Sequence, residues 1–155
     1  SYKPVLVMRD YHADNLLWLP EREGVKRVGI LDFQDAVVGS PAYDMVSFLE
    51  DARRDVDADT VNAVIEQYLS ATGQQQESFM AAYALLGAQR NCKIIGIFVR
   101  LCVRDGKSNY LSYLPRVWGH LMNDLKHPML EGMALWMEKN IRPEWRGVIT
   151  PSSTT

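Results

Sequence analysis

The spacing of apolar residues changes near residue 40, and this change constrains the fold more than any other feature of the chain. Before it, short apolar runs at residues 5–8, 16–19 and 25–31 alternate with polar or Pro- and Gly-containing segments, as is typical of strands. After it, apolar residues recur every three or four positions, as in helices that bury one face. The pattern predicts an α+β protein in which a small hairpin region precedes a mainly helical body.

The turn at residues 20–24 contains Pro, Gly and charged residues, so the second and third apolar runs are expected to pair as a hairpin. Asn15 and Asp32 lie just outside the open end of that hairpin. The segments 9–15 and 32–39, both expected to be loops, should therefore meet at one place.

Helical spacing and capping residues predict the elements of the body. Ser40 and Pro41 suit a helix start, Asp59 or Thr60 a second start, and Gly73 a helix end. The expected helices cover residues 41–54, 59–73, 77–104, 114–125 and 128–141. We expect one domain over residues 1–150, followed by a flexible polar tail at 151–155.

Charge and cysteine content exclude several classes of partner. The formal net charge is −2 and the pI is near 5.9, so no general attraction to nucleic acid or to anionic membranes is expected. Cys92 and Cys102 lack the spacing of a zinc or redox motif. No leader segment is visible, and the most apolar run is too short to cross a bilayer. We therefore expect a cytoplasmic protein.

The residues that carry chemistry gather in the first third of the chain. Phosphoryl transfer needs a carboxylate for the attacking hydroxyl and hard oxygen ligands for Mg²⁺. Asp10 and Asn15, with four residues between them in the pattern Asp-x-x-x-x-Asn, have the spacing of a kinase catalytic loop. Asp32-Phe33-Gln34 matches the metal-binding Asp-Phe-Gly element. Both halves together indicate phosphoryl transfer far better than either alone.

These segments resemble the aminoglycoside phosphotransferase and choline kinase branch of the protein-kinase-like superfamily. That family's catalytic loop is His-Gly-Asp-x-His-x-x-Asn, and Asp10, His12 and Asn15 stand at three of its positions, whereas Met8 and Arg9 replace His-Gly. Residues 32–44 follow the family pattern Asp-Trp/Phe-x-x-Ala-x-x-Gly-x-Pro-x-x-Asp.

The resemblance implies a role for each matching residue. Asp10 would be the catalytic base, and Asn15 and Asp32 would bind Mg²⁺ beside ATP. Arg9, His12 and Asp44 would shape the catalytic loop. No Gly-rich phosphate loop and no strand-borne Lys precede this region. We therefore expect a protein-kinase-like C-terminal lobe without the N-terminal lobe that grips ATP, inactive unless that lobe is supplied.

A narrower resemblance concerns the acceptor. Residues 9–16, 31–36, 50–55 and 87–94 are similar to bacterial cell-wall-recycling kinases that phosphorylate N-acetylmuramate and N-acetylglucosamine at the anomeric hydroxyl. This implies an amino sugar as the hydroxylated acceptor, in peptidoglycan recycling.

Two basic groups are candidates for binding that acceptor. In the long helix, helical spacing places four basic residues within about a quarter-turn, namely Arg90, Lys93, Arg100 and Arg104. This stripe is either a solvated helix face or, at its start and together with Gln89 and Asn91, a site for an anionic group such as the lactyl carboxylate of muramate. Arg53 and Arg54 could likewise bind the acceptor, or they could simply form ion pairs on the surface.

Three alternatives remain open. A metal-dependent phosphoesterase could use Asp10, His12 and Asp32. The chain could also be a non-catalytic binding lobe. Within the kinases, an aminoglycoside or choline acceptor is possible, although the basic stripe argues mildly against a cationic substrate.

Overall fold

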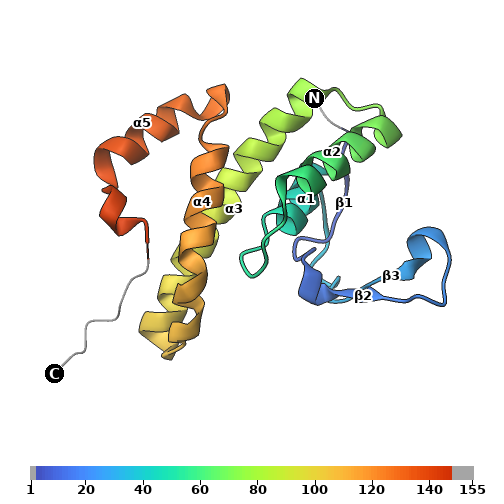
Figure 1. The fold of residues 1–155 in the computed structure, drawn as a ribbon, viewed down its shortest axis with the longest axis horizontal. Helices are drawn as coiled ribbons and strands as arrows, with labels where there is room; N and C mark the ends of the chain where they lie inside the picture. Colours follow the sequence, from blue (N-terminus) through green and yellow to red (C-terminus); the bar gives the residue numbers. More distant parts are fainter. Residues whose placement is uncertain (1–2, 148–155) are drawn as a thin grey trace. The chain divides into compact units, whose positions relative to one another are not determined.

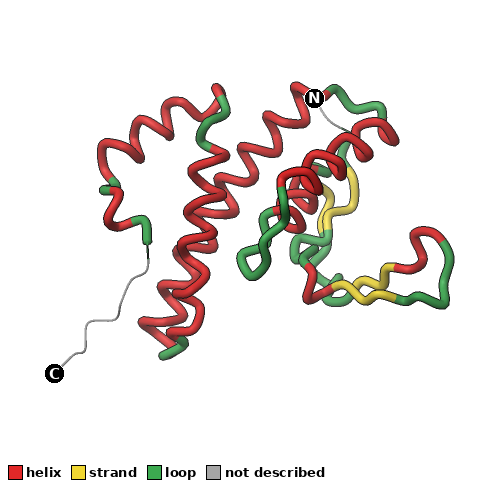
Figure 2. The backbone as a smooth tube through the Cα atoms, viewed as in Figure 1, coloured by secondary structure: helices red, strands yellow, loops and turns green. Residues whose placement is uncertain are grey.

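A computed structural model describes residues 3–147 of the chain. Figure 2 shows strands only in the part of the chain that precedes the first α-helix, and helices throughout the rest. In chain order the elements in Figure 1 and the short 3₁₀ helices between them are β1 (Val5–Val7), η1 (Ala13–Asn15), β2 (Leu16–Trp18), η2 (Gly24–Arg27), β3 (Val28–Ile30), β4 (Val37–Gly39), α1 (Ala42–Leu49), α2 (Ala58–Thr72), α3 (Gln76–Asp105), η3 (Ser108–Tyr113), α4 (Leu114–Asp124), η4 (Pro128–Leu130), α5 (Glu131–Asn140) and η5 (Pro143–Trp145).

The described residues form two compact units, one ending at Tyr83 and the other beginning at Ala84. Helix α3 belongs to both, because the division falls within it. The expectation of a single domain over residues 1–150 stays a prediction. The expected tail at 151–155 lies outside the described residues.

The predicted hairpin is confirmed. Strands β2 and β3 pair antiparallel, with Leu16 opposite Ile30 and Trp18 opposite Val28. The third apolar run forms a shorter strand than expected, because residues 24–27 make the 3₁₀ helix η2. Two further backbone bonds extend the pairing past the strand ends, from Leu31 N–H to Asn15 O and from Leu19 N–H to Arg27 O, both at 2.8 Å.

A second strand pair was not predicted. Segment 32–39 was expected to be a loop throughout, which is wrong for β4, because this strand pairs antiparallel with β1. Val7 lies opposite Val37, and Val5 lies opposite Gly39. A three-residue strand carries too little periodicity to be recognised in a sequence, and only its partner defines it. This pairing fixes the start of the 8–15 loop close to the start of α1.

Helices α1 and α2 and the start of α3 complete the first unit. Helix α1 ends at Leu49 rather than near Arg54, because the Asp51 side chain accepts a hydrogen bond from Arg53 N–H at 2.9 Å and forms a turn. Helix α2 starts one residue earlier than predicted, with Asp57 as its cap. The buried apolar residues of this unit are Val7, Ala42, Val46, Leu49, Ala52, Ile65, Phe79 and Tyr83.

The second unit is helical in the described residues. Its core joins the later part of α3 to α4 and α5, and contains Ala84, Ala88, Leu121, Leu125, Leu130 and Met137. A polar contact lies inside this unit, where the Asn91 amide donates to Asp124 Oδ2 at 3.0 Å. Gly87 permits the close approach, because a Cβ at residue 87 would lie 2.6 Å from Asp124 Oδ1. Within residues 3–147, no helix is apolar over enough length to span a bilayer.

We expect Gly87→Ala to lower the free energy of unfolding by about 1–3 kcal/mol, because the added methyl overlaps a buried carboxylate. Gly96→Ala, on the same helix but with open space at its Cβ, should instead stabilise by up to about 1 kcal/mol. Urea unfolding of the full chain measures both. Equal effects of the two substitutions would contradict the assigned contact.

Candidate active site

The loop at residues 8–15 is held by one carboxylate from α1. Asp44, in the first turn of this helix, accepts from Met8 N–H at 2.7 Å through Oδ2 and from Arg9 N–H at 3.0 Å through Oδ1. Both donors are backbone groups outside any strand pairing, so they need a partner of this kind. Hydrogen bonds to an ionised acceptor are stronger than neutral ones. Asp44 therefore fixes the entry to the loop.

Two residues of the site have a left-handed backbone without being glycine. Arg9 has φ = 68° and Asp32 has φ = 55°. Such conformations are costly for residues with a Cβ and persist only where surrounding contacts enforce them. At Arg9 those contacts are visible, since its N–H binds Asp44 and its carbonyl accepts from Ser47 Oγ at 3.2 Å. Arg9 also occupies the position where the related loop pattern has glycine, the residue that tolerates this conformation best.

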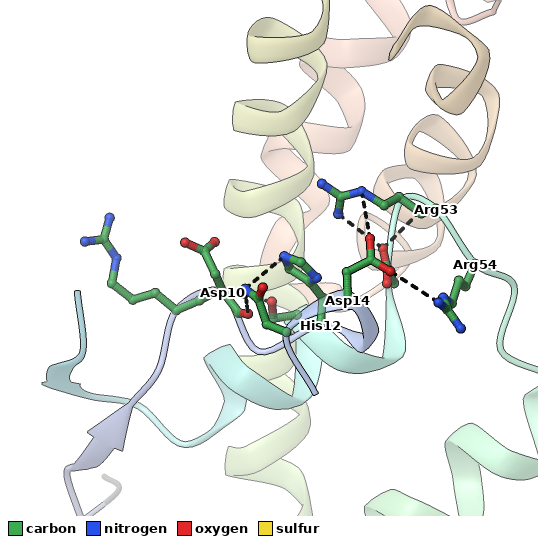
Figure 3. Close-up of polar contacts among 9 residues, drawn as sticks. Asp10, His12, Asp14, Arg53 and Arg54 are labelled. Carbon is green, nitrogen blue, oxygen red and sulfur yellow. Dashed lines mark hydrogen bonds and ion pairs between the residues drawn. The ribbon is translucent and has the colours of Figure 1, made fainter. Parts of the chain in front are cut away.

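Asn15 and Asp10 come together through the main chain of the loop. The Asn15 side-chain amide donates to the Asp10 carbonyl at 2.9 Å, and the same nitrogen lies 3.4 Å from His12 Nε2. The Asp10 carboxylate is exposed and makes no hydrogen bond or ion pair with the described residues. Figure 3 shows Asp10 and His12 side by side on this loop. The loop is thus anchored by its backbone, and the carboxylate stays available.

Asn15 and Asp32 are neighbours at the open end of the hairpin, as the bond from Leu31 N–H to Asn15 O shows. Gln34 Nε2 donates to one oxygen of Asp32, and the other oxygen has no hydrogen-bond partner among residues 3–147. Asn15 Oδ1 likewise accepts no hydrogen bond from the described residues. These are oxygen ligands of the kind that Mg²⁺ prefers.

Within residues 3–147, no three His, Cys, Asp or Glu side chains gather in a way that could hold a metal ion by themselves. Mg²⁺ commonly binds through one or two carboxylates and takes its other ligands from water and substrate phosphates. Asn15 and Asp32 fit such a partial ligand set.

Arg53 and Arg54 face an acid that the sequence did not single out. Asp14 lies 3.5 Å from Arg53 Nε and 3.2 Å from Arg54 Nη2, and Figure 3 shows its carboxylate between the two arginines. Arg53 also lies 3.8 Å from Asp51, whose carboxylate is almost fully buried. No sequence signal pairs Asp14 with residues about forty positions later. Asp51 lies in the segment 50–55 that resembles the amino-sugar kinases, but nothing in the sequence distinguished it from its neighbours.

The electrostatics of the loop favour a neutral His12. Burial, and then the positive charge of Arg53, lowers the pKa of His12, while the Asp51, Asp14 and Asp10 carboxylates act in the opposite direction. The pKa of the neighbouring Tyr11 is raised, first by burial and then by Asp44. The Tyr11 ring packs on Phe48 at 5.8 Å between centroids, which fastens the loop to α1.

The remaining candidates lie on α3 in the second unit. Asn91 is fully buried and bonded to Asp124, and Arg90 is only 8% exposed. Gln89, Lys93, Arg100 and Arg104 are exposed, and Arg104 pairs with Asp105. The basic stripe is therefore not one continuous solvated face, because Arg90 turns inward. An acceptor-binding role for Gln89, Arg90, Asn91 and Lys93 stays a prediction.

Comparison with known proteins connects this geometry to a family. The profile of the Phosphotransferase enzyme family (APH) matches residues 1–83, which include the whole 8–15 loop, the hairpin and Asp44. The chain belongs to this phosphotransferase family.

Curated relatives of this chain are named N-acetylmuramate/N-acetylglucosamine kinases. The protein from Caulobacter vibrioides is 44% identical over 143 residues, which is 92% of this chain and 39% of the relative. Those from Pseudomonas putida and Neisseria meningitidis are 38% and 36% identical over 76% of the chain, and 35% and 36% of the relatives. The chain thus spans less than two-fifths of the length of these relatives.

In this member of the family we expect Asp44→Ala to lower the free energy of unfolding by about 2–4 kcal/mol, because two backbone donors lose an ionised acceptor. Amide exchange at Met8 and Arg9 should accelerate in the same variant, as measured by NMR. Asp59→Ala, which removes an exposed first-turn acid from α2, is the matched control and should leave both amides unchanged. Unchanged exchange in Asp44→Ala would refute the anchoring role.

Proposed function

We propose that this chain is the catalytic, acceptor-binding lobe of an ATP-dependent kinase that phosphorylates a hydroxyl of an amino sugar, with N-acetylmuramate and N-acetylglucosamine as acceptors. One observation carries the proposal. The exposed Asp10 carboxylate has no partner among the described residues, whereas its loop is held by Asp44 and Asn15 beside the oxygen atoms of Asn15 and Asp32.

In this reaction Asp10 orients the acceptor hydroxyl and takes its proton as the oxygen attacks the γ-phosphorus of ATP. Asn15 and Asp32 are the residues that would hold Mg²⁺, which neutralises phosphate charge when bound. The anchored loop contributes mainly by positioning, since the base is held by its main chain and does not have to be ordered during the reaction. Arg9 and His12 support the shape of that loop.

The relatives favour an amino sugar over an aminoglycoside or choline, because all those compared are named for N-acetylmuramate and N-acetylglucosamine. The lobe assignment rests on the kinase-like spacing of Asp10, Asn15 and Asp32 and on the lack of a Gly-rich phosphate loop in these 155 residues. We accordingly expect the 155 residues alone to show no sugar phosphorylation with ATP.

The proposed activity can be tested in a chimera in which this chain replaces the matched segment of the Caulobacter relative. With ATP, the chimera should convert both amino sugars to their phosphates, detected by mass spectrometry and by ADP release. Asp10→Asn should lower kcat by roughly 10²–10⁴-fold, because the base is lost while its shape is retained. Asp35→Asn, with the same charge change at an exposed position nearby, should retain the activity.

Other outcomes would point to the alternatives. Wild-type turnover by the Asp10→Asn chimera would indicate a binding lobe that is not catalytic. Release of phosphate from a simple phosphomonoester without ATP would indicate a metal-dependent phosphoesterase. Phosphorylation of an aminoglycoside in preference to both amino sugars would reassign the acceptor.

A metal titration tests Asp32 separately. Asp32→Asn in the chimera should raise the Mg²⁺ concentration for half-maximal rate by at least about tenfold, because even residues that only orient metal ligands have effects of that size. Asp35→Asn again serves as the control. An unchanged Mg²⁺ dependence in Asp32→Asn would remove this residue from the ligand set.

A further inference from the structure

The Arg53 side chain lies beside the loop of the proposed base, and its guanidinium donors are not used there. Nε is 3.5 Å from Asp14 Oδ2, and Nη1 is 3.8 Å from Asp51 Oδ1. Both distances exceed the roughly 2.7–2.9 Å of a charge-assisted hydrogen bond. The guanidinium donates no hydrogen bond to residues 3–147. Its five N–H groups, arranged in a planar fork, are thus left for a ligand or solvent.

The neighbouring cation, Arg54, is engaged differently. Its Nη2 donates to Asp14 Oδ1 at 3.2 Å. In Figure 3 the Arg53 guanidinium extends over Asp14 toward the part of the loop that carries Asp10, and Arg54 lies on the other side of the Asp14 carboxylate. Of the two arginines, Arg53 is therefore the one that faces the proposed base.

A turn after α1 fixes the position from which the Arg53 side chain extends. Asp51 Oδ1 accepts from Arg53 N–H at 2.9 Å, and Arg54 N–H donates to Asp51 O at 3.4 Å. The Asp51 side chain is 3% exposed, whereas the Arg53 side chain is 35% exposed. Arg53 thus starts from a buried anchor and keeps its charged end accessible. Such a side chain needs less ordering when it binds a ligand than one on a free loop.

The charges around Arg53 are compatible with both a neutral and an anionic acceptor. Two acids, Asp14 and Asp51, and two arginines, Arg53 and Arg54, compensate one another in formal charge. A neutral sugar therefore meets no large uncompensated charge. A carboxylate can replace the long ion-pair contacts of Arg53 with two parallel hydrogen bonds to the guanidinium, which is the geometry that Arg favours.

The two acceptors of the proposed function differ in this same respect. N-acetylmuramate carries a lactyl carboxylate, whereas N-acetylglucosamine has no charged group. We propose that Arg53 binds the lactyl carboxylate of N-acetylmuramate and is the residue that distinguishes this acceptor from N-acetylglucosamine. This inference rests on the proposed function and names a specificity residue for its acceptor. Arg53 has no catalytic role in it, because the lactyl carboxylate is not a reacting group.

The first test compares the two acceptors in the chimera with the Caulobacter relative. Arg53→Gln removes the charge and the planar fork. It should lower kcat/KM for N-acetylmuramate about three- to thirtyfold more than kcat/KM for N-acetylglucosamine. Arg53→Lys keeps the charge and should recover part of that difference. Arg22→Gln, with the same charge change at an exposed position of the hairpin turn, is the control and should keep the wild-type ratio.

The second test changes the ligand instead of the protein. Binding to the chimera is measured by calorimetry without ATP, for N-acetylmuramate and for its analogue with a neutral carboxamide in place of the carboxylate. The wild-type chimera should bind the carboxamide about three- to thirtyfold more weakly. The Arg53→Gln chimera should bind the two ligands almost equally, because non-additivity of this kind identifies a direct contact. Thermal melting of each variant establishes that it is folded.

Failure of this inference can be distinguished from failure of the proposed function. Equal losses of kcat/KM with both acceptors in Arg53→Gln would overturn the inference and point instead to the ATP phosphates, which both reactions share. A carboxamide penalty of the same size in wild type and Arg53→Gln would also overturn it, as would a selective loss in Arg54→Gln in place of Arg53→Gln. A chimera that phosphorylates neither amino sugar would overturn the proposed function, and this inference with it.

Discussion

The site depends on the hydrogen bonds between the Asp44 carboxylate and the backbone N–H groups of Met8 and Arg9. They join the first turn of α1 to the loop that carries Asp10, across a sequence separation of 36 and 35 residues. The β1–β4 pairing brings those segments together, and Asp44 then fixes the left-handed conformation at Arg9. Without such an acceptor the buried loop backbone would have unpaired donors and a costly conformation with nothing to enforce it.

In this site the main chain makes the anchoring contacts, and side-chain oxygens remain available to ligands. Backbone atoms of the 8–15 loop are used for anchoring, by Asp44, Ser47 and the Asn15 amide nitrogen. The Asp10 carboxylate and Asn15 Oδ1 make no hydrogen bonds to the described residues and remain available to ligands. This is an arrangement suited to phosphoryl transfer, where the protein contributes mostly position and charge.

The helical unit after Tyr83 buries polar side chains of α3 in its interior. Asn91 of α3 and Asp124 of α4 form a buried hydrogen bond that requires glycine at position 87, so Asn91 is occupied by packing within the unit. Arg90, at 8% exposure, is also drawn inward. Residues that resemble a basic surface stripe in the sequence are thus divided between the interior and the solvent. Helical periodicity alone could not reveal this, because it gives the angular position of a residue around the helix but not which face of the helix packs against other elements.

The sequence by itself determined the order of the main elements and contains the residue spacing on which the proposed chemistry rests. Local patterns can be recognised from residues that are close together in the sequence. They include the spacing of Asp10, Asn15 and Asp32, the hairpin between β2 and β3, and the helical body. Only the tertiary structure decided the pairing of β4 with β1 and the contact of Asp14 with Arg53 and Arg54. These features join segments tens of residues apart, and their geometry depends on how the intervening chain folds, which no local pattern encodes.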